Sequence, residues 1–233
     1  MEFAQSLIAG RLLRRYKRFL ADIELEGGET VTAHCANPGS MMGLSNPGLR
    51  VWVEPASNPK RKLQYSWRLV ELEGAWAGID TSVPNRVVGE ALAARRLPGT
   101  EAYGTIRPEQ RYAASSRIDF LATEPGLPDA YLEVKNVHLV RKPGLAEFPD
   151  SVTTRGAKHL GDLTEMVAAG HRAVMIYCVQ HTAAERLAFA EDLDPGYVTA
   201  YRAARAAGVE AMAMVCTVSP AGIALDRTIP IAE

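Results

Sequence analysis

Two short stretches decide the fold of this chain: SSRIDFL at residues 115–121 and YLEVK at residues 131–135. Each mixes β-forming residues with polar ones in alternation, and the turn-forming run EPGLPD at 124–129 separates them, so two neighbouring strands are predicted. Side chains two apart on a strand share a face, which puts Glu133 beside Lys135, and a returning strand can bring Asp119 next to both. Two carboxylates and an amine in a partly apolar sheet are costly unless they hold a cation and a reacting phosphate. The pattern predicts a metal-dependent nuclease site.

The competing interpretation is a Glu–Lys pair on the surface of an amphipathic strand. An Asp followed fourteen residues later by E-x-K arises by chance in many chains, and exposed ion pairs contribute little to stability. Context favours the functional interpretation, because the neighbours of the three residues are apolar and place them in a largely buried sheet. These neighbours are Ile118, Phe120, Leu121, Leu132 and Val134.

Composition is that of a globular protein with no overall preference for nucleic acid. The 233 residues fit one large domain or two small ones, 47% are hydrophobic, and the net charge is -1. Basic residues are clustered, however, at residues 11–18 and at Lys60-Arg61-Lys62, where they can contact phosphates or simply face solvent.

Location and redox state follow from what the sequence lacks. It has no apolar run near the roughly 20 residues of a membrane span, and its first residues lack a basic segment followed by an apolar core. We therefore expect a cytoplasmic protein without a membrane partner. The three cysteines are far apart and form no C-x-x-C, which predicts reduced thiols and disfavours zinc.

The pattern of elements changes near residue 80. Before it, strands are expected at 11–25, 30–36, 50–56, 63–71 and 75–80, separated by Gly/Pro turns, which suggests a small barrel of the oligonucleotide/oligosaccharide-binding (OB) kind. After it, Asn85 is expected to cap a helix through Leu97, followed by strands near 105–112, 116–123 and 130–140, a helix near 153–169, a strand at 173–180, a helix near 196–207 and a strand at 209–218. We predict a mixed α+β chain with an OB-like barrel over 1–82 and a second domain over 83–233.

The order helix, three strands, helix, strand is that of the restriction-endonuclease-like, or PD-(D/E)xK, α/β fold, whose active site lies on the second and third strands. Over essentially its whole length the chain resembles the sugar fermentation stimulation protein A family. The stretches that carry the resemblance are 15–22 (RYKRFLAD), 34–41 (HCANPGSM), 58–62 (NPKRK), 116–120 (SRIDF), 133–137 (EVKNV), 148–150 (FPD) and 154–160 (TRGAKHL). A departure is His138, where the family is expected to favour Thr. The resemblance implies an OB-like barrel followed by a nuclease-like domain, and DNA binding, while the family name records a sugar-utilisation phenotype without specifying a reaction.

The expected catalytic centre uses oxygen ligands. Asp119 and Glu133, with the main-chain carbonyl of Val134, are the candidate ligands of Mg²⁺ or Mn²⁺, cations that prefer carboxylate and carbonyl oxygens. Lys135 is expected to orient the attacking water or to offset developing negative charge, its alternative role being a salt bridge to Glu133 alone. Glu90 is a further candidate from the preceding helix; an exposed helical Glu is an equally good interpretation.

Candidate DNA-binding residues come from both halves. On the helix near 153–169, Arg155, Lys158 and His159 follow a polar stripe that is expected to border the site and contact phosphates. In the barrel they are Tyr16, Lys17, Arg18, Lys60, Arg61 and Lys62, with cations beside aromatic rings. Phe19 is expected to be the buried aromatic of its strand, and the tight polar loop at 34–40 to present backbone N–H groups to an anion or to be a plain turn.

Three functional hypotheses follow. The first is a DNA-binding protein with a divalent-metal-dependent nuclease site, the second a non-catalytic DNA-binding regulator linked to sugar metabolism, and the third a carbohydrate-binding module. The clustered carboxylates favour the first, because a pure binder has no use for them beside phosphates. RNA in place of DNA, and a homodimer in place of a monomer, stay open.

Overall fold

The computed structural model describes residues 1–112 and 116–232. Within the first range, five strands close a barrel, because β3 pairs with β5 as well as with β2. The order around it is β3-β2-β1-β4-β5, and β6 extends it beside β5. The strands are β1 (Ile8–Tyr16), β2 (Leu20–Leu25), β3 (Thr30–Cys35), β4 (Arg50–Pro55), β5 (Tyr65–Leu72) and β6 (Ala75–Gly78). Alternate residues fill its interior around the fully buried Trp67.

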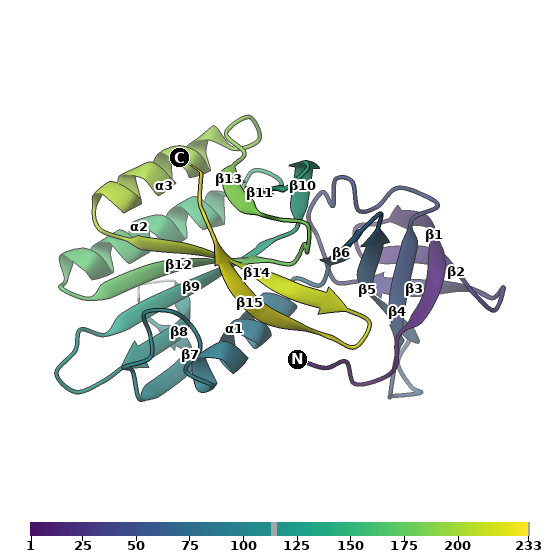
Figure 1. The fold of residues 1–233 in the computed structure, drawn as a ribbon, viewed down its shortest axis with the longest axis horizontal. Coiled ribbons are helices and arrows are strands. Elements are labelled where there is room, and N and C mark those ends of the chain that lie inside the picture. The colour runs from purple at the N-terminus through teal and green to yellow at the C-terminus, as the bar shows by residue number, and fades with distance from the viewer. Residues whose placement is uncertain (113–115, 233) are drawn as a thin grey trace.

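The second half is a mixed sheet covered by helices on both faces (Figure 1). Its strand order is β15-β14-β12-β9-β8-β7, with β12 parallel to β9 and β14. The strands are β7 (Thr105–Arg111), β8 (Arg117–Thr123), β9 (Ala130–Val137), β12 (Arg172–Val179), β14 (Glu210–Ser219) and β15 (Gly222–Ile229). A smaller sheet is formed by β10 (Leu139–Lys142), β11 (Leu145–Phe148) and β13 (Arg186–Phe189).

Helix periodicity explains which face each helix covers. α1 (Val83–Ala93) buries Val87 and Val88 against the face that carries Leu132 and Ile176. α2 (Thr154–Ala168) buries Leu160 and Leu163 against the opposite face, with α3 (Pro195–Ala206) packed beside it. These observations confirm the expected fold class: an OB barrel followed by an α/β domain. No helix in the described ranges is long and apolar enough to cross a membrane.

Several expected boundaries were wrong. The single strand expected at 11–25 is two strands, because Lys17 (φ 48°) and Arg18 (φ 62°) adopt left-handed backbone in a turn without glycine. α1 begins at Val83 after Ser82, so Asn85 lies inside the helix instead of capping it. β10, β11, β13 and β15 were not predicted, since the first three have only four residues each.

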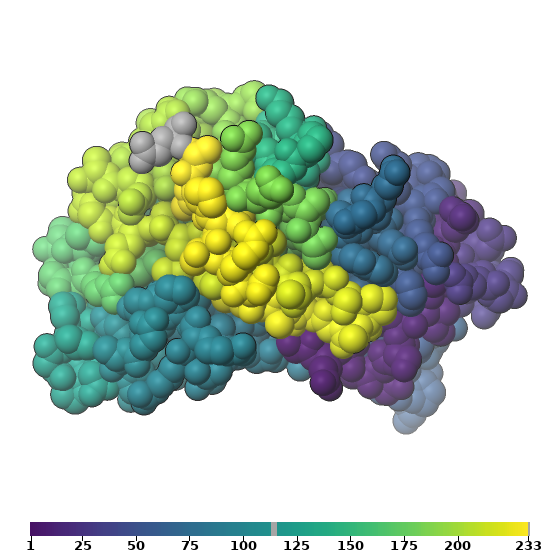
Figure 2. Space-filling model, in the orientation of Figure 1, coloured from purple at the N-terminus to yellow at the C-terminus, as the bar shows by residue number. Residues whose placement is uncertain are grey.

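The two halves are joined by a buried amide at the end of β12. The side chain of Gln180, fully buried, donates to the carbonyl oxygen of Asp80 at 3.2 Å and to Asn136 Oδ1 at 2.7 Å. The main chain adds a bond from Gly78 N to Gln180 O at 2.8 Å. Figure 2 shows the C-terminal strands reaching across the junction to the N-terminal segment, where Glu2 bridges Gly222.

We expect Gln180→Ala to lower the free energy of unfolding by about 2 kcal/mol or more, because it leaves Asn136 Oδ1 unpaired and removes one of the two donors to the Asp80 carbonyl oxygen. Urea denaturation measures the change. Gln110, whose amide is exposed, is the matched control, and its replacement by Ala should change stability by less than about 0.5 kcal/mol. Equal effects of the two substitutions would contradict this role of Gln180.

Candidate functional site

Asp119 and Glu133 face each other where β8 and β9 separate. Regular pairing joins Phe120 to Leu132 and ends there, and one further residue of the same register brings Asp119 opposite Glu133. Opposed residues of antiparallel strands lie on one face of the sheet. Instead of a backbone partner, Val134 N donates to Asp119 Oδ2 at 2.7 Å. The amide and carbonyl of one strand residue point to the same side, so the Val134 carbonyl is also directed toward Asp119.

The second oxygen of Asp119 is held by α1. Asn85 Nδ2 donates to Asp119 Oδ1 at 2.7 Å, which ties the start of the helix to the start of β8. Burial, followed by the negative charge of Glu133, raises the pKa of Asp119, and these two hydrogen bonds only partly offset them. The negative charges of Asp119 and Glu133 therefore repel each other. A cation bound between the two carboxylates would reduce this repulsion.

Glu133 is 2% exposed and has two unlike oxygens. Its Oε1 accepts from Lys135 Nζ at 2.7 Å and contacts His159 Nδ1. Burial alone would raise the pKa of Glu133, but the hydrogen bond with His159 and the charge of Lys135 outweigh it and lower the pKa. Its Oε2 is buried and has no hydrogen-bond partner among the described residues. A buried ionised oxygen without a donor is rare in folded proteins, so this oxygen requires an explanation.

Helix α2 brings His159 to this point. Thr153 caps the helix, accepting from Gly156 N at 3.1 Å, and Asp194 Oδ2 accepts from Thr153 N at 2.7 Å. Arg155 Nε donates to His159 Nε2 at 3.3 Å, so the neutral ring carries its proton on Nδ1 and donates it to Glu133. His159 is thus buried against the carboxylates, not part of an exposed stripe.

Arg155 and Lys158 flank the site from the exposed side of α2. Lys158 Nζ donates to Asp162 at 2.7 Å and to Ser116 Oγ at 2.6 Å, which fixes the residue before β8. Arg155 keeps the rest of its guanidinium at the surface. The hydrogen bonds of Arg155 and Lys158 show that each has a structural role beside the site.

Glu90 is not brought to Asp119. Its carboxylate pairs with the amino group of Met1 at 2.7 Å and with Arg86 at 3.4 Å, and it is 44% exposed. The reason is helical geometry: five residues separate it from Asn85, about 140° around the axis once full turns are removed. The residue of α1 that reaches the carboxylates is Asn85, which the sequence pattern had assigned to the helix cap.

Sequence reasoning also missed Tyr112, at the end of β7. Its buried hydroxyl has no hydrogen-bond partner within the described part of the chain. Burial and the nearby charges of Glu133, Asp162 and Asp119 raise the pKa of Tyr112, so it stays protonated next to the carboxylates. Its only sequence signal is proximity to residue 119, which is too weak to single out one tyrosine.

The basic residues of the barrel lie mostly at its surface. Lys17 and Arg18 are exposed in the β1–β2 turn, and Tyr16 donates its hydroxyl to Asp22 Oδ1 at 3.1 Å. The expectation for Phe19 was wrong: it is 46% exposed and stacks on His34, with ring centroids 6.5 Å apart, because the turn rotates it out of the strand alternation.

The second basic cluster precedes β5. Lys60 and Lys62 are exposed, whereas Arg61 is partly held by a bond from its guanidinium to Ser66 Oγ at 2.8 Å. This basic cluster belongs to the barrel, whereas the carboxylates belong to the second half of the chain. The position of the cluster therefore does not depend on the position of the carboxylates.

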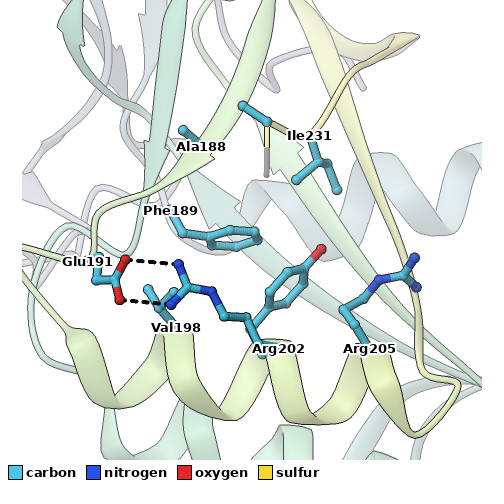
Figure 3. A pocket seen from close by; sticks show the side chains of 9 residues that line it. Ala188, Phe189, Glu191, Val198, Arg202, Arg205 and Ile231 are labelled. Carbon is cyan, nitrogen blue, oxygen red and sulfur yellow. Dashed lines mark hydrogen bonds and ion pairs between the residues drawn. The ribbon is translucent and has the colours of Figure 1, made fainter.

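A cavity of about 450 Å³ lies away from the carboxylate site, between α3 and β13 (Figure 3). Phe189, Val198 and Ile231 line it, and Arg202 at its edge pairs with Glu191 at 2.8 and 2.9 Å. It contains none of the predicted site residues.

The residues at the carboxylate site fit a hard divalent cation. In residues 1–112 and 116–232 no three His, Cys, Asp or Glu side chains gather as a metal site. Two carboxylates and a main-chain carbonyl are nevertheless an adequate protein share for Mg²⁺, which commonly keeps several waters and binds substrate phosphate. The partnerless Glu133 Oε2 is the observation that supports the fit.

The raised pKa of Asp119 gives stability a defined pH dependence. The folded chain keeps the proton of the Asp119 carboxyl group to higher pH than the unfolded chain, whose aspartate has a pKa of about 3.9. The contribution of Asp119 to the free energy of unfolding therefore falls as pH rises from the unfolded pKa through the raised pKa of the folded state. Asp119→Asn should therefore be more stable than the wild type at pH 7, with the difference shrinking toward pH 4 in urea denaturation.

Asp162 is the control with the opposite sign. Burial would raise the pKa of Asp162, but hydrogen bonds from Lys158 and Ser116 lower it, so Asp162→Asn should lose stability at pH 7. If Asp119→Asn behaves as Asp162→Asn does, the repulsion between Asp119 and Glu133 is not the dominant effect.

Similarity to known proteins was found for both halves. Residues 13–79 match the domain described as "SfsA N-terminal OB domain", and residues 82–222 match "Sugar fermentation stimulation protein RE domain". A "Sugar fermentation stimulation protein homolog" of Dinoroseobacter shibae is 60% identical, covering 99% of this chain and 96% of that protein. The homolog of Ruegeria pomeroyi is 57% identical, covering 96% and 97%.

A solved structure shows the same fold. The Pyrococcus furiosus SfsA structure, described as a complex with Ca²⁺, matches with a TM-score of 0.89 at 24% identity, covering 100% of this chain and 98% of that one. On the sequence matches to both domains and to full-length relatives, this chain belongs to the sugar fermentation stimulation protein family.

Proposed function

We propose that this protein binds DNA and hydrolyses phosphodiester bonds with Mg²⁺ or Mn²⁺ at the site formed by Asp119, Glu133 and Lys135. The observation that carries the proposal is the buried Glu133 Oε2, which has no partner in the described residues and lies opposite a carboxylate of raised pKa. A purely structural ion pair between Glu133 and Lys135 does not require the second carboxylate of Asp119, since the charge of Glu133 is already balanced by Lys135.

The chain's own residues have separable roles in this chemistry. Asp119, Glu133 and the Val134 carbonyl would hold the cation, which supplies positive charge to the phosphoryl oxygens and lowers the pKa of bound water. Asn85 and Val134 N orient Asp119. His159 and Lys135 hold Glu133 Oε1, which leaves Oε2 as the oxygen of Glu133 that would bind the cation.

Lys135 is the residue with the clearest catalytic role. Its side chain is 14% exposed and sits between Glu133 and His159, at 2.7 and 3.3 Å. With its charge shared by a bound cation, Glu133 would pair less strongly with the Lys135 ammonium. Lys135 would then orient the attacking water or stabilise charge that develops in the transition state.

A nuclease assay with Mg²⁺ and with Mn²⁺, on single-stranded, double-stranded and flapped DNA, tests the proposal. We expect metal-dependent cleavage that EDTA abolishes, and Lys135→Ala to reduce it by about 10²-fold or more with DNA affinity nearly unchanged. Lys142→Ala, at an exposed lysine of β10, should leave cleavage unchanged. A wild type that is inactive over the whole panel would refute the catalytic claim.

The alternative is a non-catalytic DNA-binding regulator linked to sugar metabolism. One observation favours it: Glu133 Oε1 is already engaged by Lys135 and His159, as a structural network would be. It predicts DNA binding without cleavage, and only small affinity changes in Lys135→Ala. A carbohydrate-binding role rests on the versatility of OB barrels and on the family name alone.

DNA binding itself is expected to depend on the exposed cations of the barrel. Replacing Arg18, Lys60, Arg61 and Lys62 by Ala should weaken binding to unrelated sequences alike and flatten the dependence of log affinity on log salt, because fewer counterions are released. Fluorescence anisotropy from 50 to 200 mM salt measures both.

The control for loss of charge alone also removes four charges, by replacing the exposed residues Arg95, Arg96, Arg186 and Arg227 of the second half by Ala. An unchanged affinity and salt slope in the barrel variant, or an equal loss in the control, would place DNA binding on another surface.

A further inference from the structure

A pocket of about 310 Å³ lies between the two halves of the molecule. The barrel contributes the loop after β3, at residues 37–39, and Thr81, while the second half contributes the end of β9 and residues 148–153 ahead of α2. Two stretches with no role in the carboxylate site, NPGS at 37–40 and FPD at 148–150, meet here.

The barrel loop is held in place by hydrogen bonds from both halves of the chain. Arg15 donates to the carbonyl oxygens of Asn37 at 2.8 Å and Gly39 at 3.0 Å. The amide of Gly39 donates to Asn37 Oδ1 at 2.8 Å, and that of Ser40 to Asp150 Oδ2 at 3.2 Å. The amides of Gly39 and Ser40 therefore already have acceptors within the chain.

One buried side chain at the pocket has an unused donor. Gln180 donates to Asn136 Oδ1, so the Asn136 amide group must donate to His138 Nδ1, at 3.0 Å. This chain places the proton of the neutral ring on Nε2. Burial lowers the pKa of His138, which keeps the ring neutral. Its Nε2 has no hydrogen-bond partner among the residues described, although His138 is only 5% exposed.

The nearest polar group facing this donor is a carboxylate. Asp150 Oδ2 lies 3.6 Å from His138 Nε2, beyond hydrogen-bond distance. The pocket therefore offers a donor and an acceptor side by side. A phosphate or carboxylate would be repelled by Asp150, and an ammonium could not accept from Nε2–H, whereas a hydroxyl group satisfies both at once.

We infer that this pocket binds a sugar hydroxyl of the nucleic-acid strand that enters the carboxylate site. The inference rests on the proposed function. The pocket and the carboxylate site are neighbours along α2, because Thr153 lines the pocket and caps the helix, and Arg155, two residues later, donates to the His159 ring that contacts Glu133. The hydroxyl comes from one of two sources, a 3′ terminus or a ribose 2′ position.

Three fluorescein-labelled 12-mers of one sequence distinguish the sources: DNA ending in a 3′-hydroxyl, the same DNA ending in a 2′,3′-dideoxynucleotide, and RNA ending in a 3′-deoxynucleotide. Anisotropy is measured on the full chain in EDTA, so that no probe is cleaved. We expect at least one hydroxyl-bearing probe to bind about 3- to 10-fold more tightly than the dideoxy DNA, the worth of one hydrogen bond. Preference for the first probe assigns the strand end, and preference for RNA assigns the ribose.

Variants then assign the preference to the pocket. His138→Ala should abolish it while leaving affinity for the dideoxy DNA unchanged, and His138→Gln, which restores an N–H donor, should recover part of it. His181→Ala is the control, because His181 is equally buried but does not line the pocket. The comparison of probes on the wild type needs no variant, so a poorly folded His138→Ala leaves the test intact.

The outcomes separate this inference from the proposed function. Equal affinity of the wild type for all three probes, or a preference that survives His138→Ala, overturns the hydroxyl pocket and leaves nuclease activity standing. A preference that depends on His138, in a protein that cleaves nothing with any metal, supports the pocket and overturns only the catalytic claim. No binding to any probe overturns the inference together with the DNA-binding proposal.

Discussion

The carboxylate of Glu133, buried in the middle of β9, is the constraint around which the second half of this molecule is organised. An ionised carboxylate taken out of water costs several kcal/mol unless it is paired and hydrogen-bonded. Lys135 and His159 provide that compensation at one oxygen. Because His159 comes from α2, compensating the charge also fixes the helix against the sheet, and Arg155 in turn fixes the histidine ring. The second oxygen has no hydrogen-bond partner among the described residues.

Hydrogen bonds to the second carboxylate, that of Asp119, connect the sheet to the first helix in the same way. Where β8 and β9 separate, a backbone amide loses its strand partner, and the side chain of Asp119 replaces it. Asn85 then joins the other oxygen to α1, whose first residue follows the barrel by only a few positions. The carboxylate pair is consequently held from the barrel side as well as from α2. Gln180 adds a buried link between the halves at the neighbouring strand end. Of these bonds, the one from Gln180 to the carbonyl oxygen of Asp80 crosses between the halves, so movement of one half against the other would disturb that bond.

How far the sequence could be read depended on the length and periodicity of each element. The period of two in β8 and β9 was enough to place Asp119, Glu133 and Lys135 together, because register between neighbouring strands follows from which residues are apolar. The helix was harder. Its cap is Ser82 instead of Asn85, so Asn85 lies inside the helix and meets Asp119, whereas Glu90 is about 140° further around the axis and does not. In the barrel, a turn made of Lys17 and Arg18 in left-handed backbone has no glycine to reveal it, so Phe19 was assigned to the wrong environment. His138 shows a third limit, because its unused donor depends on amide orientations set by Gln180, 42 positions away in the chain.

The raised pKa of Asp119 bears on whether the carboxylate pair belongs to an enzyme or to a purely structural scaffold. A purely structural scaffold would be more stable if residue 119 were neutral, since repulsion between the charges of Asp119 and Glu133 lowers the free energy of unfolding. An Asn at this position could make the same two hydrogen bonds once the amide of Asn85 turned over. Keeping a carboxylate there is an advantage only when something positive binds between the two acids. Stability sacrificed at a buried pair of like charges is a common feature of sites that bind or react, and in this chain it is concentrated at one point of the sheet, next to a lysine that already stabilises negative charge.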